Sequence, residues 1–121
     1  MVGARKTSWA TCPLTENGAV RVVSNPRYPN TTGTASAAAD LVGGLCGLLG
    51  HVFWPDSVSL LDPDVCQIGY LTASGQVTDS HLLALAVANS GRLATFDRRI
   101  VTSAVPAGDR AVLVLGAGRT A

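Results

Sequence analysis

The sequence predicts an α/β fold in which short strands alternate with helices and pair mostly in parallel. Two observations support this class. Short apolar runs fit strands, and they lie at residues 8–12, 51–54, 93–96 and 111–115. Longer segments between them have the composition or spacing of helices, and they lie at residues 16–24, 36–49 and 79–88. Strands that alternate with helices are typical of a largely parallel sheet.

The first half of the chain is predicted to hold two strands and two helices. Pro13 ends the first strand, and Thr15 is available to cap the helix that follows. Prolines and asparagines at residues 25–33 predict a loop. The next helix has apolar residues at i, i+3 and i+4 spacing: Ala38, Leu41, Val42, Leu45, Leu48 and Leu49. Trp9 and Trp54 flank the two strands, and we expect both in the core.

The second half begins with a mixed pattern and then becomes more regular. Leu60 is predicted to start a short helix that ends at Pro63, and a turn is predicted around Gly75. Thr78 is predicted to cap the helix at residues 79–88, which is apolar on nearly every side. A helix of this composition is expected to be buried from both directions.

Composition and charge limit the classes of function. The 121 residues predict one domain, because domains most often run to about 100–150 residues. With 47% hydrophobic residues the chain can bury a core, although only 14% of its residues are charged. A net charge of +1 is too small for a general affinity for nucleic acid. Any such affinity therefore depends on local pairs of basic residues.

The sequence shows no signal for export or membrane insertion. No apolar stretch of signal-peptide length follows the basic residues near the start. The apolar run at residues 35–49 is shorter than the about 20 residues that a bilayer-spanning helix needs. Three cysteines without CxxC spacing favour free thiols in a reducing compartment, and they are Cys12, Cys46 and Cys66. We therefore expect a cytoplasmic protein.

Three acidic residues, Glu16, Asp79 and Asp97, each lie where a short apolar run meets the next element. In a protein of alternating strands and helices, such junctions gather along one edge of the sheet, where ligands usually bind. Carboxylates brought together repel one another, so a cation is their natural partner. The pattern therefore predicts a metal-dependent site.

Each acidic residue also has a purely structural interpretation. Asp79 and Glu16 could be carboxylates at helix starts, where they interact favourably with the helix dipole. Asp97 could form a surface ion pair of little energetic value with Arg98 or Arg99. These two arginines could instead bind RNA phosphates, which guanidinium groups contact in a bidentate way, or could form a solvated pair.

Several segments resemble PIN-domain toxins of the VapC type. Residues 9–26, WATCPLTENGAVRVVSNP, resemble the family's second acidic motif. Residues 78–86, TDSHLLALA, and residues 91–99, GRLATFDRR, resemble the third and fourth motifs. Residues 51–61 also resemble the sequence that is usual in this family between the second and third motifs. The resemblance covers most of the chain, with the motifs in the correct order and spacing.

The resemblance implies a PIN-like, three-layer α/β/α fold with a mostly parallel sheet. It implies a ribonuclease of a toxin–antitoxin system, whose acidic cluster holds Mg²⁺ or Mn²⁺. It also implies a cognate antitoxin that blocks the site, and often a homodimer. The alternative is a catalytically inactive PIN remnant that still binds an antitoxin or a sister toxin.

The family's first strand, first helix and first metal-binding Asp have no counterpart in this sequence. Residues 1–7 are too short and too polar to replace a strand–helix unit, and they contain no carboxylate. We therefore expect a single PIN-like domain over residues 1–121 that is truncated at its N-terminus. A start codon placed too late or a decayed copy would explain this, and intact later motifs favour the first explanation.

Under the nuclease interpretation, Asp79 and Asp97 are metal ligands. Glu16 orients or deprotonates the attacking water, or supports the metal from a second layer. Mg²⁺ suits such a site because it prefers oxygen ligands and keeps several of its waters. His51 and His81 lack a metal-ligand spacing such as HExxH, so we expect neither to bind the metal.

Overall fold

The computed structural model of the chain describes residues 8–116, so the prediction made for residues 1–7 lies outside the described residues. The chain forms two compact units, Met1–Asp56 (unit 1) and Ser57–Ala121 (unit 2). Each unit contains one pair of parallel strands.

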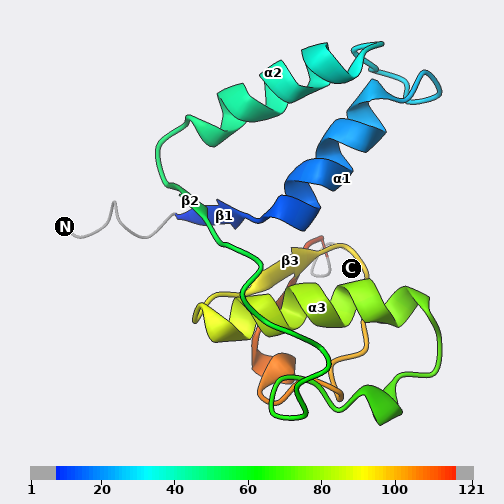
Figure 1. Ribbon diagram of the computed structural model, residues 1–121, viewed down its shortest axis with the longest axis vertical. Helices are drawn as coiled ribbons and strands as arrows, with labels where there is room; N and C mark the ends of the chain where they lie inside the picture. Colours follow the sequence, from blue (N-terminus) through cyan, green and yellow to red (C-terminus); the bar gives the residue numbers. More distant parts are fainter. Residues whose placement is uncertain (1–7, 117–121) are drawn as a thin grey trace. The chain divides into compact units, whose positions relative to one another are not determined.

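Unit 1 consists of two short parallel strands joined by a pair of helices (Figure 1). Its elements are β1 (Trp9–Thr11), α1 (Pro13–Ser24), α2 (Ala35–Cys46) and β2 (His51–Phe53). The helices α1 and α2 pack against each other. In the strand register, Trp9 lies opposite His51 and Thr11 lies opposite Phe53. Because side chains alternate along a strand, these four residues share one face of the pair.

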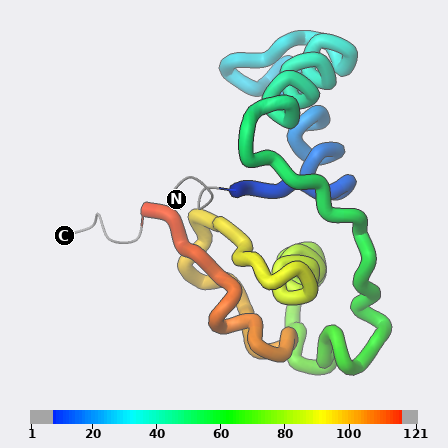
Figure 2. Tube along the Cα trace, turned by 90° about the vertical axis from the view of Figure 1, so that its left-hand side faces the viewer, coloured from blue at the N-terminus to red at the C-terminus, as the bar shows by residue number. Residues whose placement is uncertain are grey.

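Unit 2 contains one long helix and a second parallel pair. Its elements are η2 (Ile68–Tyr70), α3 (Gly75–Ala88), β3 (Leu93–Thr95), η3 (Gly108–Arg110) and β4 (Val112–Val114). Helix α3 contacts β3 and η3, and Figure 2 shows the chain from β3 to β4 passing beside this helix. The buried apolar cluster of the unit comprises Leu83, Ala84, Val105 and Ala111.

The predicted α/β class with parallel strands is confirmed. All four strands fall inside the segments that the sequence predicted, and each is three residues long. Helix α3 is buried over much of its circumference, with Leu83 and Leu85 both inaccessible to solvent although they point in different directions. Within residues 8–116 no helix combines the length and the apolar character needed to cross a membrane.

The predicted start of the third helix is wrong. Helix α3 begins at Gly75, four residues before Asp79, and Thr78 is therefore not its cap. The side chain of Gln76 explains the earlier start, because its Oε1 accepts hydrogen bonds from the backbone N–H groups of Thr72 (2.8 Å) and Ala73 (3.2 Å). These bonds fix the turn that leads into the helix.

Helix α1 also begins earlier than predicted. Its N-cap is Cys12, Pro13 is its first residue, and Thr15 lies in the first turn rather than at the cap. The Thr15 hydroxyl reaches back and accepts a hydrogen bond from the Cys12 N–H at 2.9 Å. Proline suits this position because its fixed φ is helical and its missing N–H would have had no partner within the helix.

Three predictions about apolar residues are wrong. Helix α2 ends at Cys46, so Leu48 and Leu49 are not part of it, and Leu49 is 97% exposed. Leu60 lies in a turn and starts no helix, and the short helical segment of this region is η2. Trp9 is 39% exposed rather than in the core, because its ring lies at the end of a two-stranded pair against His51.

Candidate functional site

The three predicted acidic residues lie at different kinds of position. Glu16 is in the first turn of α1, in unit 1. Asp79 lies inside α3 and Asp97 follows β3, both in unit 2. Glu16 and the two aspartates therefore belong to different units, and the grouping of all three carboxylates stays a prediction.

Asp79 is not a helix-start carboxylate. No acidic residue lies in the first turn of α3, so the helix-dipole interpretation of Asp79 is wrong. Asp79 is half-buried, and in the described part of the chain its carboxylate has neither a hydrogen bond nor an ion pair. The role of Asp79 as a metal ligand stays a prediction.

Asp97 is held by hydrogen bonds to neighbouring residues rather than by an ion pair. Thr95 Oγ1 accepts the Asp97 N–H at 3.0 Å, and Asp97 Oδ1 accepts the Arg99 N–H at 2.8 Å. Within residues 8–116 neither Arg98 nor Arg99 forms an ion pair with this carboxylate, so the ion-pair interpretation is wrong. Both arginines are exposed, which leaves their guanidinium groups accessible to a polyanion.

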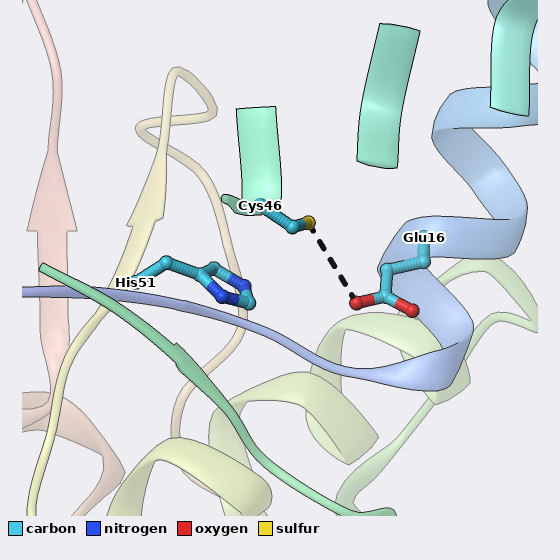
Figure 3. Close-up of side chains that lie close together, drawn as sticks. All are labelled: Glu16, Cys46 and His51. Atoms are coloured by element: carbon cyan, nitrogen blue, oxygen red, sulfur yellow. Dashed lines mark hydrogen bonds between the residues drawn. The ribbon is translucent and has the colours of Figure 1, made fainter. Parts of the chain in front are cut away.

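In unit 1 the structure brings Glu16 together with two residues that the sequence did not associate with it. Figure 3 shows the side chains of Glu16, Cys46 and His51 facing one another. Each offers one potential ligand atom, and these three atoms lie within 4.8 Å of one another. All three residues are half-buried, and the Cys46 thiol lies 3.9 Å from Glu16 Oε2.

The Thr11 hydroxyl lies at the point where these three side chains converge. It donates to Glu16 Oε2 at 2.6 Å and lies 2.8 Å from His51 Nε2 and 3.9 Å from Cys46 Sγ. A hydroxyl carries one proton, and here that proton is directed to Glu16. The Thr11 oxygen can accept a hydrogen bond from His51 Nε2 in the tautomer that carries its proton on this nitrogen.

The residue spacings of the sequence do not indicate this cluster, and His51 was not expected to be a metal ligand. Cys46 and Glu16 are 30 residues apart, and His51 and Thr11 are 40 residues apart, so a search for short ligand spacings could not group them. The available signal was the pairing of the two strands of unit 1. A parallel pairing of residues 9–11 with residues 51–53 places His51 and Thr11 on one face.

Acidic side chains that follow parallel strands are typical of α/β proteins with a ligand site at that edge of the sheet. Comparison with known proteins identifies which class of α/β protein this is. Over 106 residues the chain is 45% identical to the ribonuclease VapC44 of Mycobacterium tuberculosis, covering 88% of this chain and 74% of that protein. It is 51% identical to the ribonuclease VapC38 of the same organism over 98 residues, which are 79% of this chain and 66% of the relative.

A third relative, the ribonuclease VapC39 of M. tuberculosis, is 40% identical over 96 residues, which are 79% of this chain and 69% of that protein. No protein-family model matches the sequence, and no solved structure matches it. The chain belongs to the VapC ribonuclease family, as its acidic motifs predicted, and its α/β fold is of the PIN class.

Proposed function

We propose that this protein is a metal-dependent endoribonuclease that acts as the toxin of a toxin–antitoxin pair. Its similarity to several proteins named VapC ribonucleases, over most of the chain, carries this proposal. The proposal treats residues 1–121 as a single PIN-like domain in which both units serve one activity. It places the protein in the cytoplasm, where its RNA substrate is found.

Glu16, Asp79 and Asp97 are the residues assigned to this activity. Their carboxylate oxygens are the donors that Mg²⁺ or Mn²⁺ prefers. Two features of unit 2 fit such an ion: the half-buried Asp79 carboxylate has no partner among the described residues, and one oxygen of Asp97 is oriented by the Arg99 N–H. Fixing one carboxylate oxygen by a backbone hydrogen bond leaves the other available as a ligand.

When bound, such an ion lowers the pKa of a coordinated water and offsets negative charge on the phosphate. The residues of the chain have the remaining tasks. Asp79 and Asp97 hold the ion, and Glu16 orients the attacking water and accepts its proton. Arg98 and Arg99 bind neighbouring phosphates of the RNA through paired N–H donors.

The proposed partners are an RNA substrate and a cognate antitoxin protein that covers the acidic residues. A second copy of the chain is a further proposed partner. The antitoxin would explain how a cell carries this ribonuclease without damage, since the enzyme acts only when the antitoxin is removed.

The proposal is tested with the full chain, by RNA cleavage in the presence of Mg²⁺ and by growth arrest on induced expression. Asp79→Asn and Asp97→Asn should each abolish both, because the amide cannot replace a charged ligand. Asp109→Asn changes an exposed aspartate of η3 and serves as the matched control that should stay active. Unchanged growth arrest by either of the first two variants contradicts the catalytic assignment.

The same experiment separates the enzyme from an inactive remnant. If the wild-type chain cuts no RNA with Mg²⁺ or Mn²⁺ but still binds an antitoxin, the protein is a binding module. Binding of the metal ion, measured by titration without RNA, then decides whether the site itself has been lost.

A further inference from the structure

The cluster of Glu16, Cys46 and His51 contains donors of three different chemical kinds. A carboxylate oxygen, a thiol sulfur and an imidazole nitrogen lie within 4.8 Å of one another (Figure 3). Mg²⁺ and Ca²⁺ take oxygen ligands almost exclusively, so this set does not suit them. Zn²⁺ takes sulfur, nitrogen and oxygen ligands together, at about 2.0–2.3 Å and usually in a tetrahedron.

The three donors come from three separate elements of unit 1. Glu16 lies in the first turn of α1, Cys46 is the last residue of α2, and His51 is the first residue of β2. The α1–α2 contact and the β1–β2 pairing hold these elements in place, which brings the three donors together. Such a convergence from packed elements is what a pre-formed metal site requires.

The Thr11 hydroxyl shows that the space between the donors suits a polar ligand. Its oxygen lies 2.6 Å from Glu16 Oε2, 2.8 Å from His51 Nε2 and 3.9 Å from Cys46 Sγ. Metal binding through His51 Nε2 would replace the contact of this nitrogen with Thr11, with the ring proton on Nδ1, while the Thr11 hydroxyl can keep its hydrogen bond to Glu16.

We propose that Glu16, Cys46 and His51 form a binding site for Zn²⁺ or a similar transition-metal ion. The Cys46 thiol releases its proton to solvent and binds as thiolate, while His51 binds as neutral imidazole. Three protein ligands leave a fourth position for water. The site is distinct in donor chemistry from the all-carboxylate site of the proposed nuclease.

The site has a consequence for activity that rests on the proposed function. Glu16 is shared, so an ion bound by Glu16, Cys46 and His51 withdraws this carboxylate from catalysis. Zn²⁺ is therefore expected to inhibit RNA cleavage that Mg²⁺ supports, with Cys46 and His51 as the residues that make the enzyme sensitive.

The binding test uses the full chain without RNA. Zn²⁺ affinity is measured by competition with a chromophoric chelator, and Co²⁺ is added as a spectroscopic probe of thiolate coordination. Wild type should bind one equivalent and show a thiolate-to-cobalt charge-transfer band. Cys46→Ser and His51→Gln should each lower the affinity for Zn²⁺ at least about tenfold. Loss of a residue that only supports a metal ligand already costs about tenfold, so loss of a ligand should cost no less.

Matched controls lie in unit 2. Cys66→Ala removes a thiol and His81→Gln removes an imidazole outside the cluster, so both should bind Zn²⁺ as wild type does. Far-ultraviolet circular dichroism checks folding, and Cys46→Ala replaces Cys46→Ser if the serine variant unfolds. Zn²⁺ binding that is absent, or that survives both cluster substitutions unchanged, overturns the proposal and leaves the cluster as a hydrogen-bonded group only.

The second test measures Mg²⁺-dependent RNA cleavage with increasing Zn²⁺. Wild type should be inhibited, and Cys46→Ser should need at least about tenfold more Zn²⁺ for the same inhibition. Equal inhibition of the two contradicts the regulatory consequence. If wild type cuts no RNA, the proposed function fails, whereas the Zn²⁺ site is still decided by the binding test alone.

Discussion

The two units of this protein are stabilised in different ways. Unit 2 is built around a buried apolar cluster in which Leu83 is fully inaccessible and Val87 and Leu93 pack against it. In the described part of unit 1, helix α1 has no buried residue and α2 has Ala38 alone. Unit 1 instead places a threonine, a glutamate and a histidine in a hydrogen-bonded group.

The two units therefore differ in the interactions that stabilise them and in the potentially reactive side chains that they carry. The stability of unit 2 depends on how well its apolar side chains fill the core, because a tightly packed core tolerates neither cavities nor added atoms. Unit 1 depends more on polar contacts, and it also carries the mixed group of potential metal ligands. Substitutions of the same type should therefore have different effects in the two units.

The largest expected difference comes from truncating a leucine in each unit. Leu83→Ala should lower the free energy of unfolding by about 2–5 kcal/mol, because it leaves a cavity in the core of unit 2. Leu49→Ala in unit 1 should change it by less than about 0.5 kcal/mol, because this side chain is 97% exposed. Urea unfolding measures both, and equal losses would contradict the contrast.

Replacing a glycine by alanine should destabilise the protein in unit 2 and stabilise it in unit 1. A Cβ on Gly108 would lie 2.9 Å from Leu83 Cδ2 and 3.0 Å from the Thr102 carbonyl oxygen, so Gly108→Ala should cost about 1–3 kcal/mol. A Cβ on Gly43, inside α2, meets nothing within 4 Å, so Gly43→Ala should stabilise by up to about 1 kcal/mol. Thermal unfolding of the two variants shows the sign directly.

The polar group of unit 1 is tested by Thr11→Val. The substitution keeps the side-chain shape but leaves Glu16 and His51 without the bridging hydroxyl, at an expected cost of about 1–3 kcal/mol. Thr11→Ser retains the hydroxyl and should restore most of the stability. If valine is tolerated as well as serine in urea unfolding, these hydrogen bonds contribute little to unit 1.

The smallest expected effect concerns the buried thiol of unit 2. Burial raises the pKa of the Cys66 thiol in the folded protein. Its contribution to stability is therefore complete below the pKa of the unfolded thiol and is lost as the pH rises towards the higher pKa of the folded protein. Unfolding measured at several alkaline pH values should show a loss for wild type that Cys66→Ala lacks.

Labelling with a thiol reagent compares the accessibility of one cysteine in each unit. Cys66 is buried whereas Cys46 is half-buried, so Cys46 should react first in the folded protein. Equal rates for the two thiols would show that Cys66 is open to solvent. Addition of Zn²⁺ should protect Cys46 and leave Cys66 unaffected if the proposed site forms.

The elements were largely predictable from local patterns, and their boundaries were not. The apolar runs predicted all four strands and the three α-helices, because alternation and helical spacing are properties of neighbouring residues. The starts of α1 and α3 were missed because they depend on particular side-chain hydrogen bonds, from Thr15 and Gln76. Such bonds leave no periodic signal in the sequence.

The sequence by itself determined the α/β class, the parallel pairing and the family, since each rests on short motifs or on periodicity along the chain. Only the tertiary structure decided that Glu16 lies beside Cys46 and His51, and that Trp9 is exposed. Both outcomes depend on the register of β1 with β2 and on the packing of α1 against α2. Contacts between residues 30 or 40 positions apart are set by the way the elements pack, which local sequence does not encode.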